Sequence, residues 1–230
     1  MGGDVGLLAR DAGLRRPTVM MVTDGSRIGA DGGNGMMGDA LVAAIGRAAR
    51  AGVDLVQIRE RTLDGGDLLR LTVRALEAAA GTATGILVND RVDVALAARA
   101  RGVHLPGRGL AAPRARAIAP RLLIGRSVHS VDDAIAAERD GGCDYLLFGT
   151  VFQSTGKPAG HIMSGIAGLS AACRAVRLPV LAIGGVTVER AAEAAAAGAA
   201  GVAAIALFAQ GDEQELRARV RAIHASFTRN

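Results

Sequence analysis

Short apolar runs alternate with longer segments of helical period along most of this chain. The runs are rich in Val, Ile and Leu, as expected for strands buried on both faces of a parallel sheet. We predict strands at 18–22, 54–58, 85–88, 102–105, 122–125, 145–148, 180–183 and 201–205. We predict helices between and after them at 39–51, 66–80, 92–98, 131–140, 165–176, 188–197 and 214–226, with a weaker one at 112–119. Ser130 and Thr187 are expected to cap two of these helices.

Eight strands that are each followed by a helix predict a single α/β domain, a (β/α)8 TIM barrel over residues 17–230. The alternative is an open doubly wound sheet, which usually has fewer such units. Residues 1–16 show no clear period and are expected to form a flexible N-terminal segment. The Gly- and Met-rich stretch 25–38 is expected to be a loop, either a lid over the site or a disordered insertion.

The composition narrows the class of partner. Half of the residues are apolar, but the chain has only four Phe, one Tyr and no Trp, so its core is aliphatic. The net charge is +5, yet the arginines are scattered and stacking aromatics are scarce, which argues against nucleic acid and favours anionic small molecules. Two distant cysteines give no zinc or disulfide motif. With no recognisable leader and no long apolar run, we expect a cytoplasmic location without membrane contact.

Charged residues follow the second predicted strand, at the end of the barrel where the loops gather. With a period of two, Arg59 and Arg61 share the side of Gln57 and place two guanidinium groups toward the mouth. The alternative is a solvated rim in which Glu60 forms an ion pair with one of these arginines.

Further polar residues follow the third and sixth strands. Asn89 can hold a ligand heteroatom, while Asp90 can cap the following helix. Lys157 is the only lysine among 27 Lys and Arg residues, and it lies in a Gly-rich segment. Its compact ammonium is suited to a phosphate or carboxylate, although an isolated lysine can also have no function.

Two histidines have different surroundings in the sequence. His104 lies between apolar residues of a strand, which indicates a hydrogen-bonded core histidine. His129 follows a strand, leads into a helix and has Ser127 and Ser130 close to it in the sequence. Hydroxyl groups can fix the tautomer of an imidazole, so His129 is the candidate acid/base residue.

Glycines at the last two strands favour a phosphate site. Gly184 and Gly185 follow the seventh strand, and Ile205 and Ala206 end the eighth, where barrels commonly bind phosphate through backbone N–H groups. A tight turn is the alternative for such glycines. No His, Cys and Glu cluster has the spacing of metal ligands. Together these features indicate proton-transfer chemistry on a phosphorylated small molecule.

Six motifs resemble the thiamine-phosphate synthase/TenI superfamily over about residues 19–208. They are VQIRER at 56–61, NDRVDVA at 89–95, GVHL at 102–105, IGRSVHS at 124–130, DYLLFG at 144–149 and PVLAIGG at 179–185. The resemblance implies a barrel, a homodimer and one of two activities. Thiamine-phosphate synthases join a pyrimidine diphosphate to a thiazole phosphate with magnesium. The TenI branch aromatises a carboxythiazole phosphate, with a histidine that matches His129 as acid and base.

The motifs differ from the synthase pattern at several positions. Residues 106–109 read PGRG, where the synthase pattern has an acid that helps to hold magnesium. Arg61 replaces a lysine and Ala206 replaces a serine, whereas the pair Asn89 and Asp90 follows the synthase pattern. The strand-two, His104 and His129 motifs look like the tautomerase.

The sequence therefore leads to the prediction of an isomerase, a thiazole tautomerase that needs no cofactor and no metal. The alternatives are a thiamine-phosphate synthase, with Mg²⁺ on Asp90, and a non-catalytic barrel that binds thiazole phosphate. The predicted catalytic residue is His129. The predicted substrate contacts are Arg59, Arg61, Asn89, Ser127 and Lys157, and the predicted phosphate contacts are Gly184, Gly185, Ile205 and Ala206.

Overall fold

The structure is a computed structural model that describes residues 14–25, 34–153 and 163–228. Eight parallel strands form a closed barrel in chain order, in which β8 pairs with β1. The strands are β1 (Thr18–Val22), β2 (Leu55–Ile58), β3 (Gly85–Asn89), β4 (Gly102–Leu105), β5 (Leu123–Val128), β6 (Tyr145–Gly149), β7 (Val180–Ile183) and β8 (Gly201–Ala204). The predicted α/β barrel is confirmed, and the open doubly wound sheet was the wrong alternative.

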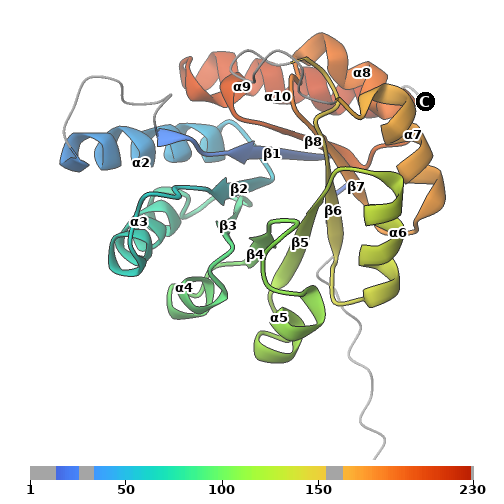
Figure 1. Ribbon diagram of the computed structural model, residues 1–230. Helices are drawn as coiled ribbons and strands as arrows, with labels where there is room; N and C mark the ends of the chain where they lie inside the picture. Colours follow the sequence, from blue (N-terminus) through green and yellow to red (C-terminus); the bar gives the residue numbers. More distant parts are fainter. Residues whose placement is uncertain (1–13, 26–33, 154–162, 229–230) are drawn as a thin grey trace, which may run out of the picture.

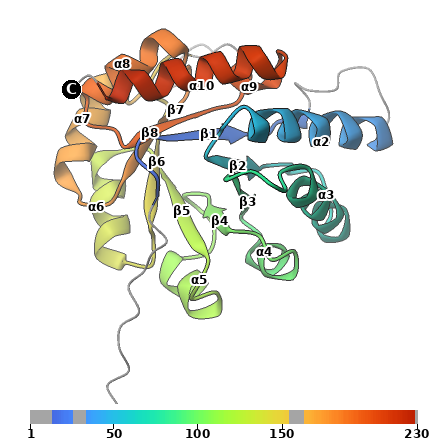
Figure 2. The same ribbon diagram turned by 180° about the vertical axis from the view of Figure 1, so that it is seen from behind.

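Helices lie around the outside of the strands in both views (Figure 1 and Figure 2). They are α2 (Asn34–Arg50), α3 (Gly65–Ala78), α4 (Val92–Ala97), α5 (Ala112–Ile118), α6 (Val131–Asp140), α7 (Gly165–Ala175), α8 (Val188–Ala196), α9 (Ala206–Ala209) and α10 (Glu213–Phe227). Ser130 and Thr187 cap α6 and α8 as predicted, since each side chain accepts a backbone N–H of the first turn. None of the helices in the described residues is long and apolar enough to cross a membrane.

The structure differs from the predicted elements in three places. Helix α2 begins at Asn34, so the end of the predicted loop 25–38 is helical, while residues 26–33 of that loop lie outside the described residues. The short helix α9 was not predicted, because four residues carry no readable period. Strand β5 continues beyond Gly125 to Val128. Residues 1–13 of the predicted N-terminal segment lie outside the described residues, while Leu14 packs against the barrel interior.

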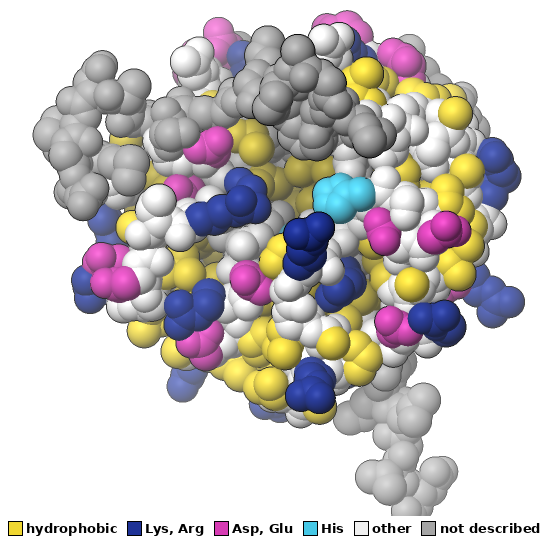
Figure 3. All heavy atoms as spheres, in the orientation of Figure 1, with side chains coloured by type: hydrophobic (Ala, Val, Ile, Leu, Met, Phe, Trp, Pro, Cys, Tyr) yellow, Lys and Arg dark blue, Asp and Glu magenta, His cyan; other side chains and the backbone are white. Residues whose placement is uncertain are grey.

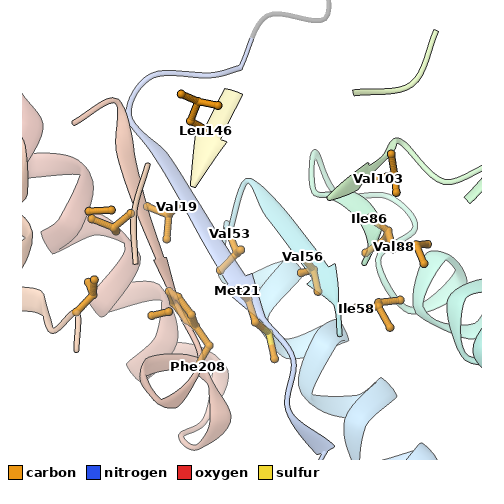
Figure 4. Packing of buried hydrophobic residues seen from close by; sticks show 14 of the residues in the cluster. Val19, Met21, Val53, Val56, Ile58, Ile86, Val88, Val103, Leu146 and Phe208 are labelled. Atoms are coloured by element: carbon orange, nitrogen blue, oxygen red, sulfur yellow. The ribbon is translucent and has the colours of Figure 1, made fainter. Parts of the chain in front are cut away.

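Alternation along the strands divides the core into two clusters. The outer cluster fills the space between strands and helices, and Figure 4 shows Val19, Met21 and Val56 among its members. The inner cluster fills the barrel and consists of Met20, Val22, Leu55, Leu87, Leu123, Tyr145, Leu147, Leu181 and Ala203. Because side chains alternate along a strand, the inward positions nearest the carboxyl ends of β2 to β5 are Gln57, Asn89, His104 and Ser127. The apolar interior is thus closed by polar side chains toward the carboxyl ends of the strands.

Candidate active site

Two amide side chains form one side of this polar layer. Gln57 is only 2% exposed, and its Nε2 donates to Asn89 Oδ1 over 3.0 Å. The second polar atom of the Gln57 amide, Oε1, is buried and has no hydrogen-bond partner in the described ranges 14–25, 34–153 and 163–228. A buried acceptor without a donor is destabilising, so this atom is suited to receive an N–H from a bound molecule.

The residues after β2 connect to the loop after β1. Arg59 is half-buried, and this burial, with the nearby charge of Arg61, lowers the pKa of its guanidinium. Glu60 accepts the Thr23 hydroxyl at 2.6 Å and the Gly25 N–H at 3.0 Å, and burial raises the pKa of its carboxyl. Among the described residues Glu60 forms no direct ion pair with Arg59 or Arg61, although the charge of Arg59 acts on its carboxyl. Glu60 instead holds two loops together, and Arg61 is exposed.

Asp90 lies exposed at the end of β3, with a positive φ of 63°. Its N–H donates to the His104 carbonyl over 2.8 Å. It does not cap the next helix, because Arg91 occupies the N-cap position without a side-chain cap, so that alternative was wrong. The Asp90 carboxylate lies against the loop after β4. A Cβ added to Gly109 in that loop would lie only 2.7 Å from Asp90 Oδ1. Within the described residues, no group of three His, Cys, Asp or Glu side chains is placed to hold a metal.

His104 is a hydrogen-bonded core residue, as the sequence indicated. It is 1% exposed, its Nδ1 lies 3.1 Å from the Tyr145 hydroxyl and its Nε2 lies 2.8 Å from Ser127 Oγ. Burial, together with the charges of Arg59 and Arg126, lowers its pKa to about 3. Its ring is therefore neutral at physiological pH. The guanidinium groups of Arg59 and Arg126 therefore lie close enough to His104 to disfavour a charged imidazole.

His129 is exposed just after β5, and its ring is held by a backbone carbonyl. Its Nδ1 lies 2.6 Å from the Gly149 carbonyl oxygen, so Nδ1 donates a proton to it, and Nε2 has no hydrogen-bond partner among the residues that the structure describes. The expected fixing of this ring by hydroxyls was wrong. Ser127 contacts His104 instead, and Ser130 caps α6. Figure 3 shows a histidine on the surface with Lys or Arg side chains close to it.

The two glycines after β7 have positive φ, 99° at Gly184 and 63° at Gly185. A Cβ on Gly184 would lie 2.5 Å from Thr150 Cγ2, and one on Gly185 would lie 2.4 Å from the Gln153 carbonyl oxygen. Arg190 on α8 braces the same contact, since it donates to the Gly185 carbonyl over 2.7 Å and to that of Gln153 over 3.3 Å. These glycines are therefore required where two loops pack together. Their backbones lie at the carboxyl end of β7, next to the start of α8.

The structure places most of the predicted residues at one end of the barrel. Arg59, Asn89, Ser127, His129 and Gly184 all follow or end strands at their carboxyl ends. Ile205 and Ala206 are the N-cap and first residue of α9, beyond β8. Lys157 lies outside the described residues.

The sequence interpretation did not include Gln57 among the binding residues. A polar side chain at an inward position of an apolar strand was the signal that could have found it.

Comparison with known proteins identifies relatives with a common activity. The model of a family described as thiamine monophosphate synthase matches residues 28–208. A thiamine-phosphate synthase from Chlorobium luteolum is 40% identical over 63% of this chain and 68% of its own length. One from Methanoculleus marisnigri is 41% identical over 64% of this chain and 69% of its own. A solved thiamine phosphate pyrophosphorylase from Pyrococcus furiosus superposes with a TM-score of 0.78 at 28% identity, covering 95% of this chain and 98% of its own.

These relatives overturn the predicted isomerase. The curated proteins at about 40% identity are thiamine-phosphate synthases, so the thiazole tautomerase prediction was wrong and the alternative is the better one. The prediction relied on the strand-two, His104 and His129 motifs, which lie within a barrel that both activities share. The superfamily prediction itself is confirmed.

Proposed function

Because the chain belongs to the thiamine monophosphate synthase family, we propose that it is a transferase that joins a pyrimidine diphosphate to a thiazole phosphate. The names of its relatives support this assignment. The observation that carries it in this structure is the polar layer, with its unpartnered Gln57 acceptor, beside the guanidinium groups of Arg59 and Arg126. Guanidinium groups at the mouth favour substrates that carry phosphate groups.

The proposed reaction is a substitution at carbon. The thiazole nitrogen forms a bond to the exocyclic methylene carbon of the pyrimidine, the carbon–oxygen bond breaks, and the diphosphate leaves with the electron pair. No proton is removed from the reacting carbon. A general base at His129 is therefore not required, and catalysis depends on orienting two substrates and stabilising the leaving anion.

The pyrimidine is proposed to contact the amide pair of Gln57 and Asn89. The pyrimidine of thiamine carries an amino group, which can donate to the unpartnered Oε1 of Gln57. Asn89 Oδ1 already accepts from Gln57, which fixes the orientation of both amides. This pair would hold the ring at the inner end of the site, with its methylene directed toward the mouth.

The diphosphate is proposed to lie near Arg59, Arg61 and Ser127. Arg59 is half-buried and so less hydrated than a surface guanidinium, which strengthens its contact with an anion. Magnesium is often held by one or two carboxylates together with substrate phosphates and water. The exposed Asp90 fits this role as a single protein carboxylate beside the mouth. When bound, the metal supplies neutralisation of charge on the diphosphate.

The thiazole phosphate is proposed to bind across the last two strands. The backbone at Gly184 and Gly185 lies beside the N-terminus of α8, and Ile205 and Ala206 lie at the next loop. Arg190 holds the glycine segment in place from α8. His129, whose Nε2 has no partner within the described part of the chain, is proposed as a contact to substrate from the β5 side. The homodimer and the role of Lys157 remain predictions.

A direct assay tests the proposal. The protein is incubated with hydroxymethylpyrimidine diphosphate, thiazole phosphate and Mg²⁺, and thiamine phosphate and diphosphate are measured together. Equal amounts of both products are expected, and chelation of the metal should stop their formation. Gln57→Leu should raise the KM for the pyrimidine substrate more than that for the thiazole. Tight binding of thiazole phosphate without any product would instead indicate a binding protein.

A further inference from the structure

A chain of hydrogen bonds connects the packed interior of the barrel to its mouth. Tyr145 on β6 and His104 on β4 are 0% and 1% exposed, whereas Ser127 on β5 is partly exposed. The Tyr145 hydroxyl lies 3.1 Å from His104 Nδ1, and Ser127 Oγ lies 2.8 Å from His104 Nε2. The imidazole thus bridges a buried phenol and a hydroxyl at the edge of the site.

The protonation state of each member is set by its surroundings. Burial and the charges of Arg59 and Arg126 lower the pKa of His104 to about 3, so its ring is neutral and carries one N–H. Burial raises the pKa of Tyr145 above its ordinary value, so its hydroxyl keeps its proton. The three hydrogen-bonded side chains therefore contain one phenol proton, one imidazole proton and one serine proton.

Only two arrangements of these protons make both hydrogen bonds. In the first, Tyr145 donates to Nδ1 and Nε2–H donates to Ser127, which leaves the serine proton free to point outward. In the second, Ser127 donates to Nε2 and Nδ1–H donates to Tyr145, which leaves the phenol proton without an acceptor. His104 is the partner of the Tyr145 hydroxyl within the described residues, and that hydroxyl is fully buried. Because a buried donor without an acceptor is strongly disfavoured, the first arrangement predominates.

We propose that Tyr145 and His104 are positioning residues that hold the Ser127 hydroxyl as a hydrogen-bond donor toward the mouth, where it meets an anionic oxygen of the diphosphate. This step rests on the proposed function for the identity of the ligand. It rests on the structure alone for the direction of the hydroxyl. A donor with a fixed direction suits a phosphate oxygen, which only accepts hydrogen bonds.

The neighbouring glycine is part of the same arrangement. A Cβ on Gly125 would lie 2.0 Å from Tyr145 Cζ and 2.3 Å from its hydroxyl oxygen. Gly125 also pairs with Tyr145 and with His104 across the two adjacent ladders. The missing side chain on β5 is therefore what allows the phenol to reach the imidazole.

The direction of the hydrogen bonds between Tyr145, His104 and Ser127 can be measured without substrate. Long-range ¹H–¹⁵N correlation spectra of the native protein show which nitrogen of a histidine ring carries the proton. We expect His104 to carry it on Nε2, and Tyr145→Phe should remove this preference. A proton on Nδ1 in the native protein would overturn the inference. This readout does not depend on turnover, so it decides the inference even if no thiamine phosphate is formed.

A double-mutant cycle tests the link to the ligand, with inorganic pyrophosphate as probe in calorimetry. Ser127→Ala should weaken its binding on the order of 10- to 100-fold, as for a charge-assisted hydrogen bond. Tyr145→Phe should weaken it by about 3- to 10-fold in the native background, but by less than about twofold when Ser127 is already alanine. Leu147→Val, another inward-facing change on β6, is the control and should leave affinity unchanged. Equal effects of Tyr145→Phe in both backgrounds would show a merely structural role and refute the proposal.

Discussion

Replacing Gly185 by alanine tests whether the glycine segment after β7 is set by close packing of loops. The substitution adds one methyl group at a φ of 63°. A residue with a Cβ in this left-handed region costs about 1–2 kcal/mol. The new Cβ would also lie 2.4 Å and 2.7 Å from the carbonyl oxygens of Gln153 and Phe152. Both contacts are with backbone, so the loop must move, and overpacking of this kind costs about 1–3 kcal/mol more.

Gly81 provides a matched control. Its φ is 76°, and a Cβ there would meet nothing within 4 Å, so Gly81→Ala carries the backbone strain without the clash. We expect Gly81→Ala to lose about 1–2 kcal/mol of unfolding free energy and Gly185→Ala to lose about 2–5 kcal/mol. The entropy that alanine removes from the unfolded chain is similar in both variants and cancels in the comparison.

The assay is thermal unfolding of the two variants beside the native protein. For a domain of this size, each kcal/mol shifts Tm by roughly 2–4 °C, so Gly185→Ala should melt about 4–20 °C below the native protein. It should also bind thiazole phosphate more weakly, because the shifted loop carries the proposed phosphate site. Equal losses of Tm in the two variants would refute the packing argument, since only the strain common to both would then matter.

Three further predictions concern the mouth of the barrel. His129→Ala should raise the KM for phosphorylated substrates by about 3- to 30-fold but change kcat by less than tenfold, because the reaction needs no base. A loss of kcat by about 100-fold or more would instead indicate an acid/base role for His129. Asp90→Asn should raise the Mg²⁺ concentration for half-maximal activity at least about tenfold, and an unchanged value would remove Asp90 from the metal site. The folded pKa of His104 is about 3 against an ordinary 6.5, so the unfolded chain binds more protons between these values and stability falls as pH drops below 6.5. Denaturant titrations at several pH values give the unfolding free energy of the native protein and of His104→Gln as a function of pH. Below pH 6.5 the two plots should differ in slope by up to about 1.4 kcal/mol per pH unit, and parallel plots would exclude a neutral buried His104.

The sequence pattern was enough to predict the barrel. Buried parallel strands are short apolar runs, and the ranges predicted for β1, β4 and β7 have the same bounds in the structure. The caps at Ser130 and Thr187 were also predictable, because a cap is a local contact between residues three apart. Helix α9 was missed, since four residues show no period.

The contacts within the site could not be predicted in the same way. Gly149 holds the His129 ring from another strand, and Tyr145 reaches His104 from two strands away. Such partners depend on strand register, which a single sequence does not show. The choice between the two activities failed for a related reason. It depended on a few residues at the mouth, whereas the relationship to the synthases extends over most of the chain.

The single tyrosine has a practical consequence for solution studies. The chain contains one Tyr and no Trp, and that tyrosine is fully buried beside His104. Near-ultraviolet absorption above the phenylalanine bands, and the intrinsic fluorescence, therefore come from one known position at the centre of the barrel. Any change in emission reports on the environment of this phenol without an added label. The protein thus carries its own optical probe at the inner end of the proposed diphosphate contact.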